Sequence, residues 1–242
     1  MKILGLDIAT STGWCLLEDD KLVKYGMINI PSEMNLFQRI KFFENNLIQI
    51  LNDNNPDEVH IEDVILGISG AKTMAYLGRL NGVAISVCYN KVGDHIKLYA
   101  PPIWKAHSFS GLTGMATKAE IQISVIKHFK LINDSDLDVI IKPLKDFNDD
   151  DNKYAGQLNL YKKTITTCKQ IIARKRTDDN TKSQTNMAMK EAEKKLKEVK
   201  SIINKRKKEI EKIYKDVSVS LTAKCGLTAD VSDSIGIAYC RC

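Results

Sequence analysis

The feature that most constrains the fold of this chain is a long stretch in which apolar residues recur at alternating spacings of three and four. It occupies 154–172, is interrupted by the polar segment TDDNTKSQT, and resumes over 189–213. This alternation is typical of the contact seam of a coiled coil, and two such helices joined by one polar turn fold back on each other. We therefore predict an antiparallel helical hairpin, a coiled coil, at 150–216. Its seam comprises Tyr154, Leu158, Tyr161, Ile165, Cys168, Ile172, Met189, Ala192, Leu196, Val199, Ile203, Arg206, Ile210 and Ile213.

The segments before and after this stretch have the pattern of a mixed α/β domain. Three short apolar runs separated by turn residues come first and predict an antiparallel meander. Strands then alternate with amphipathic helices, which favours parallel crossover connections. The expected strands are 2–8, 13–18, 22–30, 59–65 and 96–100, and the expected helices are 35–52, 71–89, 117–131 and one that begins in ADVSDSIGIAYC. We predict one domain over 1–242, a mixed five-stranded sheet flanked by helices, into which the hairpin at 150–216 is inserted.

A proline pair ends the fifth expected strand, and the segment that follows, IWKAHSFSGLTGMATK, is predicted to be a mobile loop. Its aromatic residues are Trp104, His107 and Phe109. Such side chains can stack on an unpaired base, or they can anchor the loop to the core.

Positive charge is concentrated in the predicted hairpin. Residues 151–215 hold 19 Lys and Arg against 8 Asp and Glu, a local net charge of +11, whereas the rest of the chain carries −5 and the whole chain +6. A concentrated basic block favours a polyanionic partner, and the alternative is a solvated charged helix. Lysines on the outer faces of the hairpin are candidates for contacts with DNA phosphates. They are Lys194, Lys195, Lys197, Lys200, Lys205, Lys207, Lys208 and Lys212. The apolar seam equally permits a dimerisation or partner coiled coil.

Composition excludes several classes of protein. The longest apolar runs, such as Val83 to Cys88, are much shorter than the ~20 residues needed to span a bilayer, and the N-terminus lacks the pattern of a secretory signal. The six cysteines form no CxxC pair and no cluster at zinc-ligand spacing, which favours free thiols in a reducing compartment. We therefore expect an intracellular protein without a membrane partner.

Four acidic residues form a candidate metal-binding set. Asp7 lies inside the first expected strand, Glu62 near the end of the fourth, and Asp230 and Asp233 on the closing helix. Because residues three apart on a helix share a face, the last two can point the same way. Carboxylates that meet without counter-ions raise one another's pKa, and a divalent cation such as Mg²⁺ or Mn²⁺ removes that cost. Each acid alone has a plainer interpretation as a turn cap or a solvated residue. Asp63 is expected on the opposite face of its strand and is not in the set.

Five short segments, in chain order, resemble the RuvC family of Holliday junction resolvases within the ribonuclease H-like superfamily. They are GLDIATSTGW, VHIEDV, LGRLNGVAISV, TKAEIQ and ADVSDSIGIAYC, and the likeness covers residues 1–132 and 220–242. The resemblance implies a ribonuclease H-like fold and a homodimeric endonuclease that nicks two strands of a four-way DNA junction. It implies two Mg²⁺ ions per site, with Mn²⁺ as a substitute, and hydrolysis by the two-metal-ion mechanism. It also implies the cytoplasm of a bacterium or of a phage-infected host.

The resemblance assigns roles to individual residues. Asp7, Glu62, Asp230 and Asp233 match the four metal-binding acids of the family, while Lys118 and Lys105 match its basic residues near the scissile phosphate. A lysine there can neutralise charge that develops on the phosphoryl group. The chain departs from the family in having Ala9 where glycine is usual, Ile65 or Leu66 where many members have a wedging aromatic, and the basic hairpin. These departures favour a phage or mobile-element member that acts broadly on branched DNA.

Two other functions fit parts of the sequence. The string DIATSTGW also resembles the first phosphate loop of actin-like and sugar-kinase ATPases. Those enzymes need a second phosphate-binding hairpin in a duplicated domain, and the sequence holds no second copy. The other alternative is a module that keeps the acids and binds junctions without cutting them.

Overall fold

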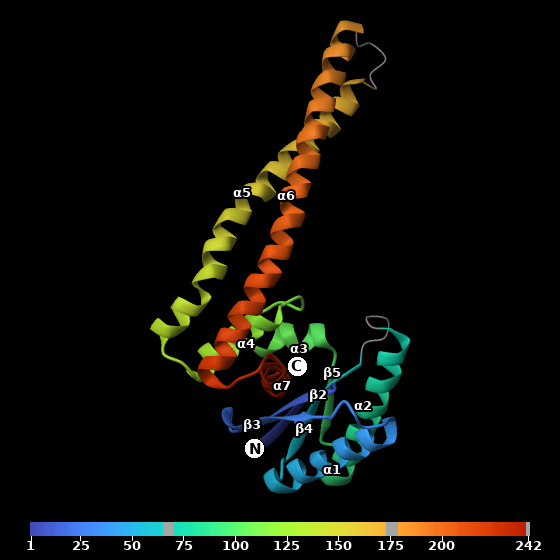
Figure 1. Cartoon of the computed structure of the whole chain (residues 1–242), viewed down its shortest axis with the longest axis vertical. Helices are drawn as coiled ribbons and strands as arrows, with labels where there is room; N and C mark the ends of the chain where they lie inside the picture. Colours follow the sequence, from blue (N-terminus) through green and yellow to red (C-terminus); the bar gives the residue numbers. More distant parts are fainter. Residues whose placement is uncertain (65–69, 173–178, 241–242) are drawn as a thin grey trace. The chain divides into compact units, whose positions relative to one another are not determined.

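The computed structural model describes residues 1–64, 70–172 and 179–240, with the backbone alone at 148–156, 158, 171–172 and 179–180 (Figure 1). The chain divides into two compact units. The first comprises Met1–Leu137 with Ser218–Cys242, and the second comprises Asp138–Val217. The sheet belongs to the first unit, and the second is helical. A single domain over 1–242 with an insertion at 150–216 stays a prediction.

The globular elements expected from the sequence are present. The strands are β1 (Lys2–Asp7), β2 (Ser11–Glu18), β3 (Lys21–Asn29), β4 (Glu58–Glu62) and β5 (Ile96–Tyr99). The helices are α1 (Leu36–Asn54), α2 (Ala71–Val92), α3 (Pro101–Ser108), α4 (Lys118–Phe129), α5 (Asp134–Ile172), α6 (Asp179–Cys225) and α7 (Ala229–Tyr239). No helix in the described ranges combines the length and the apolar character that a bilayer-crossing segment needs.

The first unit is built on a mixed five-stranded sheet with the strand order β3-β2-β1-β4-β5. β1, β2 and β3 pair antiparallel, whereas β1, β4 and β5 pair parallel. Short turns suffice for the antiparallel pairs, while α1 and α2 supply the long crossovers that parallel pairs require. This order confirms the ribonuclease H-like sheet expected from the sequence.

Alternation along the strands gives the two faces of the sheet different partners. On one face, Leu4, Leu6 and Ile61 belong to a hydrophobic core that α1 and α2 complete with Phe43 and Leu80. On the other face, α7 packs across β1, β2 and β4, and α4 packs on α7. Figure 1 shows α1 and α2 on the side of the sheet opposite α7. The side chains that point away from the α1 and α2 core therefore meet α7.

Glycines allow α7 to lie directly on the sheet. A Cβ added at Gly5 would lie 2.1 Å from the backbone oxygen of Ser234, and one at Gly13 would lie 2.2 Å from the backbone oxygen of Asp230. On the same face, the Sγ of Cys15 donates to the Ser234 oxygen at 3.4 Å. The position of α7 on β1 and β2 is thus set by backbone atoms, which leave little freedom to move.

The expectation of a mobile loop after the proline pair is wrong for its first half. Pro101–Ser108 forms α3, with prolines in its first turn, where a missing N–H costs nothing and the fixed φ suits a helix. Trp104 from this helix is fully buried, and a Cβ at Gly236 of α7 would lie 2.6 Å from its ring. Phe109 is also buried and stacks on Tyr239 with 5.1 Å between ring centroids. Base stacking by these two residues is therefore wrong, and the anchoring alternative is confirmed.

The burial of α6 in the second unit follows the predicted seam. Ala192 and Val199 are buried, and the other seam positions of α6 are half-buried. On α5, Cys168 is buried, and Tyr161 and Ile165 are half-buried. The side chains of Tyr154, Leu158 and Ile172 lie outside the described part of the chain. Within that part, the antiparallel helical pair is confirmed.

Both helices of the pair are longer than expected. α5 begins at Asp134, and its first half buries three residues that the sequence-based seam did not include, Ile141, Leu144 and Phe147. Arg206, a cation at a seam position, lies against this half. Its Nη2 donates to the Phe147 carbonyl oxygen at 3.2 Å, and its guanidinium carbon lies 4.1 Å from the centre of the Phe147 ring.

Candidate metal centre

Asp7 is the last residue of β1, and strand alternation puts it on the same face as Gly5, the face that α7 covers. The turn that follows is closed by Thr12, whose Oγ1 accepts from the Ala9 N–H at 3.2 Å and donates to the Ala9 carbonyl oxygen at 2.8 Å. Ala9 has no positive φ, so this turn does not require the glycine that is usual in RuvC proteins. A carboxylate in an otherwise apolar strand is thereby held at the edge where the strand ends.

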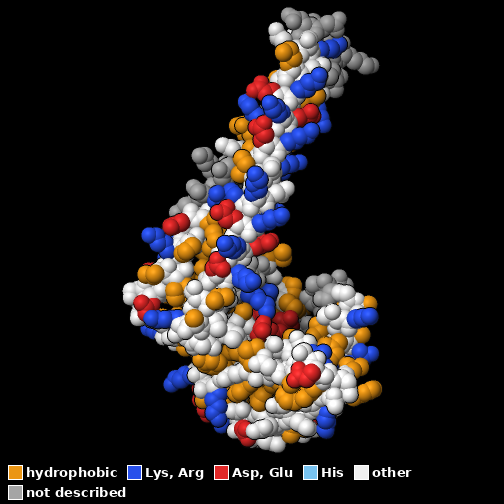
Figure 2. Space-filling view, in the orientation of Figure 1, with side chains coloured by type: hydrophobic (Ala, Val, Ile, Leu, Met, Phe, Trp, Pro, Cys, Tyr) orange, Lys and Arg blue, Asp and Glu red, His pale blue; other side chains and the backbone are white. Residues whose placement is uncertain are grey.

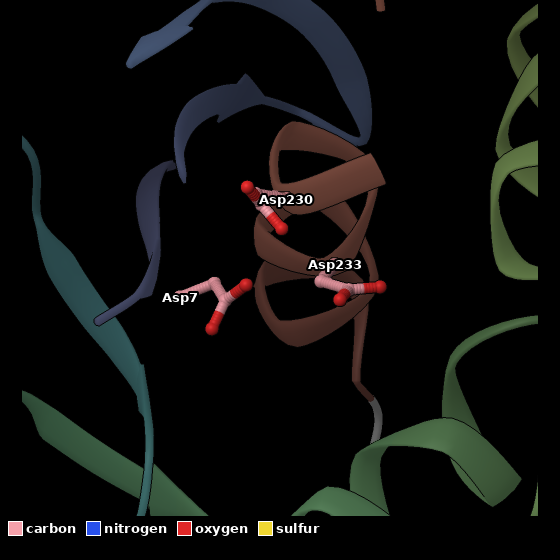
Figure 3. A group of neighbouring side chains, drawn as sticks. All are labelled: Asp7, Asp230 and Asp233. Carbon is pink, nitrogen blue, oxygen red and sulfur yellow. The ribbon is translucent and has the colours of Figure 1, made fainter. Parts of the chain in front are cut away.

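Asp230 and Asp233 come from the first turns of α7. Thr228 caps this helix, because its Oγ1 accepts from the Val231 N–H at 3.2 Å. The spacing of three residues puts both carboxylates on the side of α7 that faces Asp7 (Figure 3). One oxygen from each of the three aspartates lies within 4.8 Å of the other two. The fold therefore brings the first strand and the closing helix together at one acidic cluster.

Glu62 ends β4 beside Asp7. The parallel register of β1 and β4 pairs Leu6 with Ile61. Asp7 and Glu62 are the next residues of these two strands, so they are neighbours at the edge of the sheet. The Oε2 of Glu62 accepts a hydrogen bond from the Nε1–H of Trp104 at 2.8 Å. Glu62 is not a member of the three-aspartate cluster, but its charge acts on both Asp7 and Asp233. Glu62 therefore lies next to the three aspartates without being one of the cluster.

Lys118 is the first residue of α4 and pairs with the aspartates of α7. Its Nζ lies 2.5 Å from Asp230 Oδ1 and 3.7 Å from Asp233 Oδ2. Burial acts to lower the pKa of Lys118, but the hydrogen bond to Asp230 and the charges of the aspartates outweigh it, so this pKa is raised. The side chain is still 58% exposed, which leaves it accessible to a ligand.

Lys105 lies on α3, the helix that also carries Trp104. Its Nζ donates to the carbonyl oxygen of Ala116 at 3.4 Å and lies 5.6 Å from the centre of the Trp104 ring. Its positive charge opposes the increase that burial causes in the pKa of Glu62 and Asp233. Both lysines identified from the sequence therefore act electrostatically on the acidic cluster.

The acids are short of counter-charge. Burial raises the pKa of Asp7 well above its usual range, and the charges of Glu62 and Asp233 raise it further. Burial likewise raises the pKa of Asp233 to about 7, against the effect of Lys118. The pKa of Glu62 is raised by burial, although the hydrogen bond from Trp104 lowers it. The Oδ1 of Asp233 is buried without a hydrogen-bond partner in the described part of the chain. A divalent cation fits such a set of oxygen donors.

We expect the metal-free protein to lose stability as the pH rises from about 4 to about 7. The Asp233 carboxyl has an ordinary pKa of 3.8 and a pKa of about 7 in the fold. Between these values the folded state keeps a proton that the unfolded state has released, and stability falls with rising pH wherever that holds. At about 1.4 kcal/mol per pKa unit, the loss is on the order of a few kcal/mol. Thermal unfolding in EDTA between pH 4.5 and 8 measures it.

Asp233→Asn is the matched variant for this measurement. It should reduce the difference between acidic and neutral pH to the part that Asp7 contributes, raise the metal-free unfolding midpoint at pH 8, and abolish the increase in midpoint that we expect Mg²⁺ to give the wild type. The contrary result is that the unfolding midpoints of the wild type and of Asp233→Asn in EDTA follow the same pH profile. Burial of the Asp233 carboxylate would then not destabilise the folded protein.

Some features of the site had little or no signal in the sequence. The hydrogen bond from Trp104 to Glu62 joins α3 to β4, which are separate in the sequence. Its only sequence signal is the general rule that a buried tryptophan donates its N–H to a hydrogen-bond acceptor. His107 is exposed on α3, and its role in stacking stays a prediction. Ile65 and Leu66, at the position of the family's wedging aromatic, lie outside the described residues.

Comparison with known proteins identifies the family. A family model described as crossover junction endodeoxyribonuclease RuvC matches residues 3–140, more than half of the chain. The chain belongs to the RuvC family. The RuvC match includes the positions of Asp7, Glu62, Lys105 and Lys118 and ends before the long basic part of the helical pair. Asp230 and Asp233 lie beyond it, so their inclusion in a RuvC-type site rests on the geometry given above.

Individual RuvC proteins show the same partial likeness. The crossover junction endodeoxyribonuclease RuvC of Dictyoglomus thermophilum is 30% identical over 136 residues, which cover 54% of this chain and 84% of that protein. The RuvC of Halothermothrix orenii is 27% identical over 128 residues, 50% of this chain and 74% of that protein. A solved structure of Thermus thermophilus RuvC aligns with a TM-score of 0.46 and 17% identity, over 54% of this chain and 81% of that chain.

Proposed function

We propose that this RuvC family member is a metal-dependent endonuclease that cleaves branched DNA, four-way junctions in particular. The observation that carries the proposal is the meeting of Asp7, Asp230 and Asp233 within 4.8 Å, with Lys118 paired to two of them. The named relatives are crossover junction endodeoxyribonucleases, which supports the same reaction and substrate for this chain.

The donor set fits Mg²⁺, with Mn²⁺ as a substitute. Asp7, Asp230, Asp233 and Glu62 would hold two ions through carboxylate oxygens alone, as such hard cations prefer. The buried, unpartnered oxygen of Asp233 and the raised pKa of Asp7 support this assignment. When bound, the ions supply a water nucleophile of lowered pKa and neutralise charge on the phosphate.

The remaining side chains bind and position. Lys118 is paired with Asp230 in the metal-free protein, and its Nζ would be available to the incoming phosphate if that carboxylate held a cation. There the ammonium stabilises the charge that develops in the transition state, and Lys105 acts in the same way from α3. Trp104 is a positioning residue, because its N–H fixes the orientation of the Glu62 carboxylate.

We extend the proposal to a homodimer acting in the cytoplasm of a bacterial or phage-infected cell. A four-way junction offers two equivalent strands, and two copies related by a two-fold axis present one site to each. The ATPase alternative is not favoured, because it needs a duplicated α/β domain. The described residues hold one sheet, and the second unit is helical.

End-labelled four-way, flap and linear DNA incubated with the protein and Mg²⁺ test the proposal. We expect cleavage of the four-way junction, slower cleavage of the flap, no cleavage of the linear duplex, and none of any substrate in EDTA. ATP hydrolysis without DNA cleavage would favour the kinase-like alternative. Tight junction binding without cleavage in either Mg²⁺ or Mn²⁺ would instead establish the non-cutting module.

A further inference from the structure

Between Lys190 and Lys215, α6 carries a row of lysines on the side opposite its apolar seam. Residues that recur at spacings of three or four lie along one line of a helix. Seven lysines and one serine of this segment follow that spacing, and all eight are exposed. We call this row the lysine stripe; it comprises Lys190, Lys194, Lys197, Ser201, Lys205, Lys208, Lys212 and Lys215. Figure 2 shows Lys and Arg side chains along the length of α6.

The lysine stripe contains no acidic residue. At about 100° per residue it occupies an arc of about 80°, and the five glutamates of the segment all fall outside that arc. An ion pair at 2.8 Å joins Glu191 to Lys195, which lies off the stripe. Within the described ranges, no stripe lysine belongs to an ion pair. The stripe lysines are therefore not held in ion pairs with the protein, although Lys194 acts electrostatically on Glu191.

The opposite side of α6 is already used within the chain. Val199 is buried, and Arg206 stacks on Phe147 of α5. This intramolecular pairing takes up the seam that would otherwise serve a partner coiled coil. A second copy placed stripe against stripe would bring like charges together, which opposes association. The side of α6 that is left for a partner is therefore the charged side.

We propose that the lysine stripe binds the phosphate backbone of duplex DNA and holds one arm of the branched substrate. The substrate is taken from the proposed function, whereas the binding itself requires no cleavage. Over 25 residue steps at 1.5 Å each the stripe is about 38 Å long, close to one turn of B-form DNA at ~34–36 Å. Lysine is a flexible point charge that suits phosphates and reads no bases.

The composition of the stripe favours duplex DNA over other polyanions as its ligand. Unpaired bases are bound by aromatic side chains, and the stripe has none. A membrane surface is bound by a helix whose apolar face enters the lipid, and that face of α6 is paired with α5. Lys197, Lys200, Ser201, Asn204, Lys205 and Lys208 line one shallow hollow on α6, so every side chain around it is polar or positive. Such a surface suits a backbone of phosphates.

A triple variant tests the stripe. Lys197, Lys205 and Lys208 are replaced by glutamine, which keeps helix propensity and removes three charges. The matched control replaces Lys162, Lys163 and Lys169, exposed lysines of α5, in the same way. Binding to a 30-base-pair duplex and to a four-way junction is measured by fluorescence anisotropy in EDTA between 50 and 250 mM salt. Circular dichroism and gel filtration check helix content and oligomeric state.

The stripe variant should bind both DNAs about 10-fold or more weakly at low salt, with a salt slope less steep by up to ~0.9 for each phosphate that it no longer neutralises. The control should stay close to wild type. Equal weakening of DNA binding in both variants would show that only net charge matters, which contradicts a role specific to the stripe. Unchanged binding by the stripe variant would also overturn the proposal. Because these measurements need no cleavage, their outcome is separate from that of the nuclease assay.

Discussion

Asp7→Asn is expected to reduce the cleavage rate of a four-way junction by about 10³-fold or more, with little change in the affinity for DNA. The amide keeps the shape of the side chain but removes the charge that a cation on the cluster needs. A loss of that size corresponds to about 4 kcal/mol of transition-state stabilisation, which is within what a catalytic metal site supplies. Single-turnover cleavage in Mg²⁺ and equilibrium binding in Ca²⁺ measure the two quantities.

Asp63→Asn is the matched control, because it makes the same chemical change one residue after Glu62. Asp63 is exposed, and its Oδ1 accepts from the Val64 N–H at 2.8 Å, a local bond outside the acidic cluster. We expect cleavage close to wild type. Asp7→Asn should also be more stable than wild type in EDTA, because the wild-type carboxylate is destabilised by burial and by Glu62. A parallel loss of DNA binding and of stability would mean instead that Asp7 supports the fold.

The sequence predicts the acidic cluster because its members stand at positions with simple geometry. Asp7 interrupts an apolar strand, and Asp230 and Asp233 are three apart on a helix that follows the long basic stretch. Alternation along a strand and periodicity along a helix then determine which way each carboxylate points. What these rules do not give is the depth of the cluster. The close approach of α7 depends on Gly5 and Gly13, whose neighbours become visible only in the structure.

Sequence reasoning fails where local signals have two meanings. The proline pair is typical of the end of a strand and the start of a loop, yet proline also suits the first turn of a helix, and α3 begins there. Consequently the sequence does not predict the link from Trp104 to Glu62. The sequence-based start of α5 is too late, although Leu144 and Phe147 continue the spacing of an apolar helix face toward Asp134. The polar residues that follow Phe147 obscure that continuity.

Gly13→Ala is expected to lower the thermal unfolding midpoint by roughly 10 °C and to abolish stabilisation by Mg²⁺. The new Cβ would lie 2.2 Å from the Asp230 carbonyl oxygen and 2.8 Å from the Val231 nitrogen. Both are backbone atoms in the first turn of α7, so that turn must move off the sheet. Overpacking of this kind costs up to ~3 kcal/mol, which corresponds to roughly 10 °C for a protein of this size. Since the same turn carries Asp230, a cation held by the three aspartates would lose one of its ligands. Thermal unfolding with and without Mg²⁺ measures both effects.

Gly82→Ala is the control, and the sign of its effect should be opposite. Gly82 is exposed inside α2, and a Cβ there would meet nothing within 4 Å. Alanine is favoured over glycine by up to ~1 kcal/mol within a helix, so this variant should unfold a few degrees higher and respond to Mg²⁺ as the wild type does. The pair of variants separates the close approach of α7 from the general effect of replacing a glycine. The contrary result is a Gly13→Ala variant that unfolds at the wild-type temperature and is still stabilised by Mg²⁺. In that case the aspartates of α7 converge on Asp7 without the close approach, and glycine at position 13 does not set the geometry of the acidic cluster.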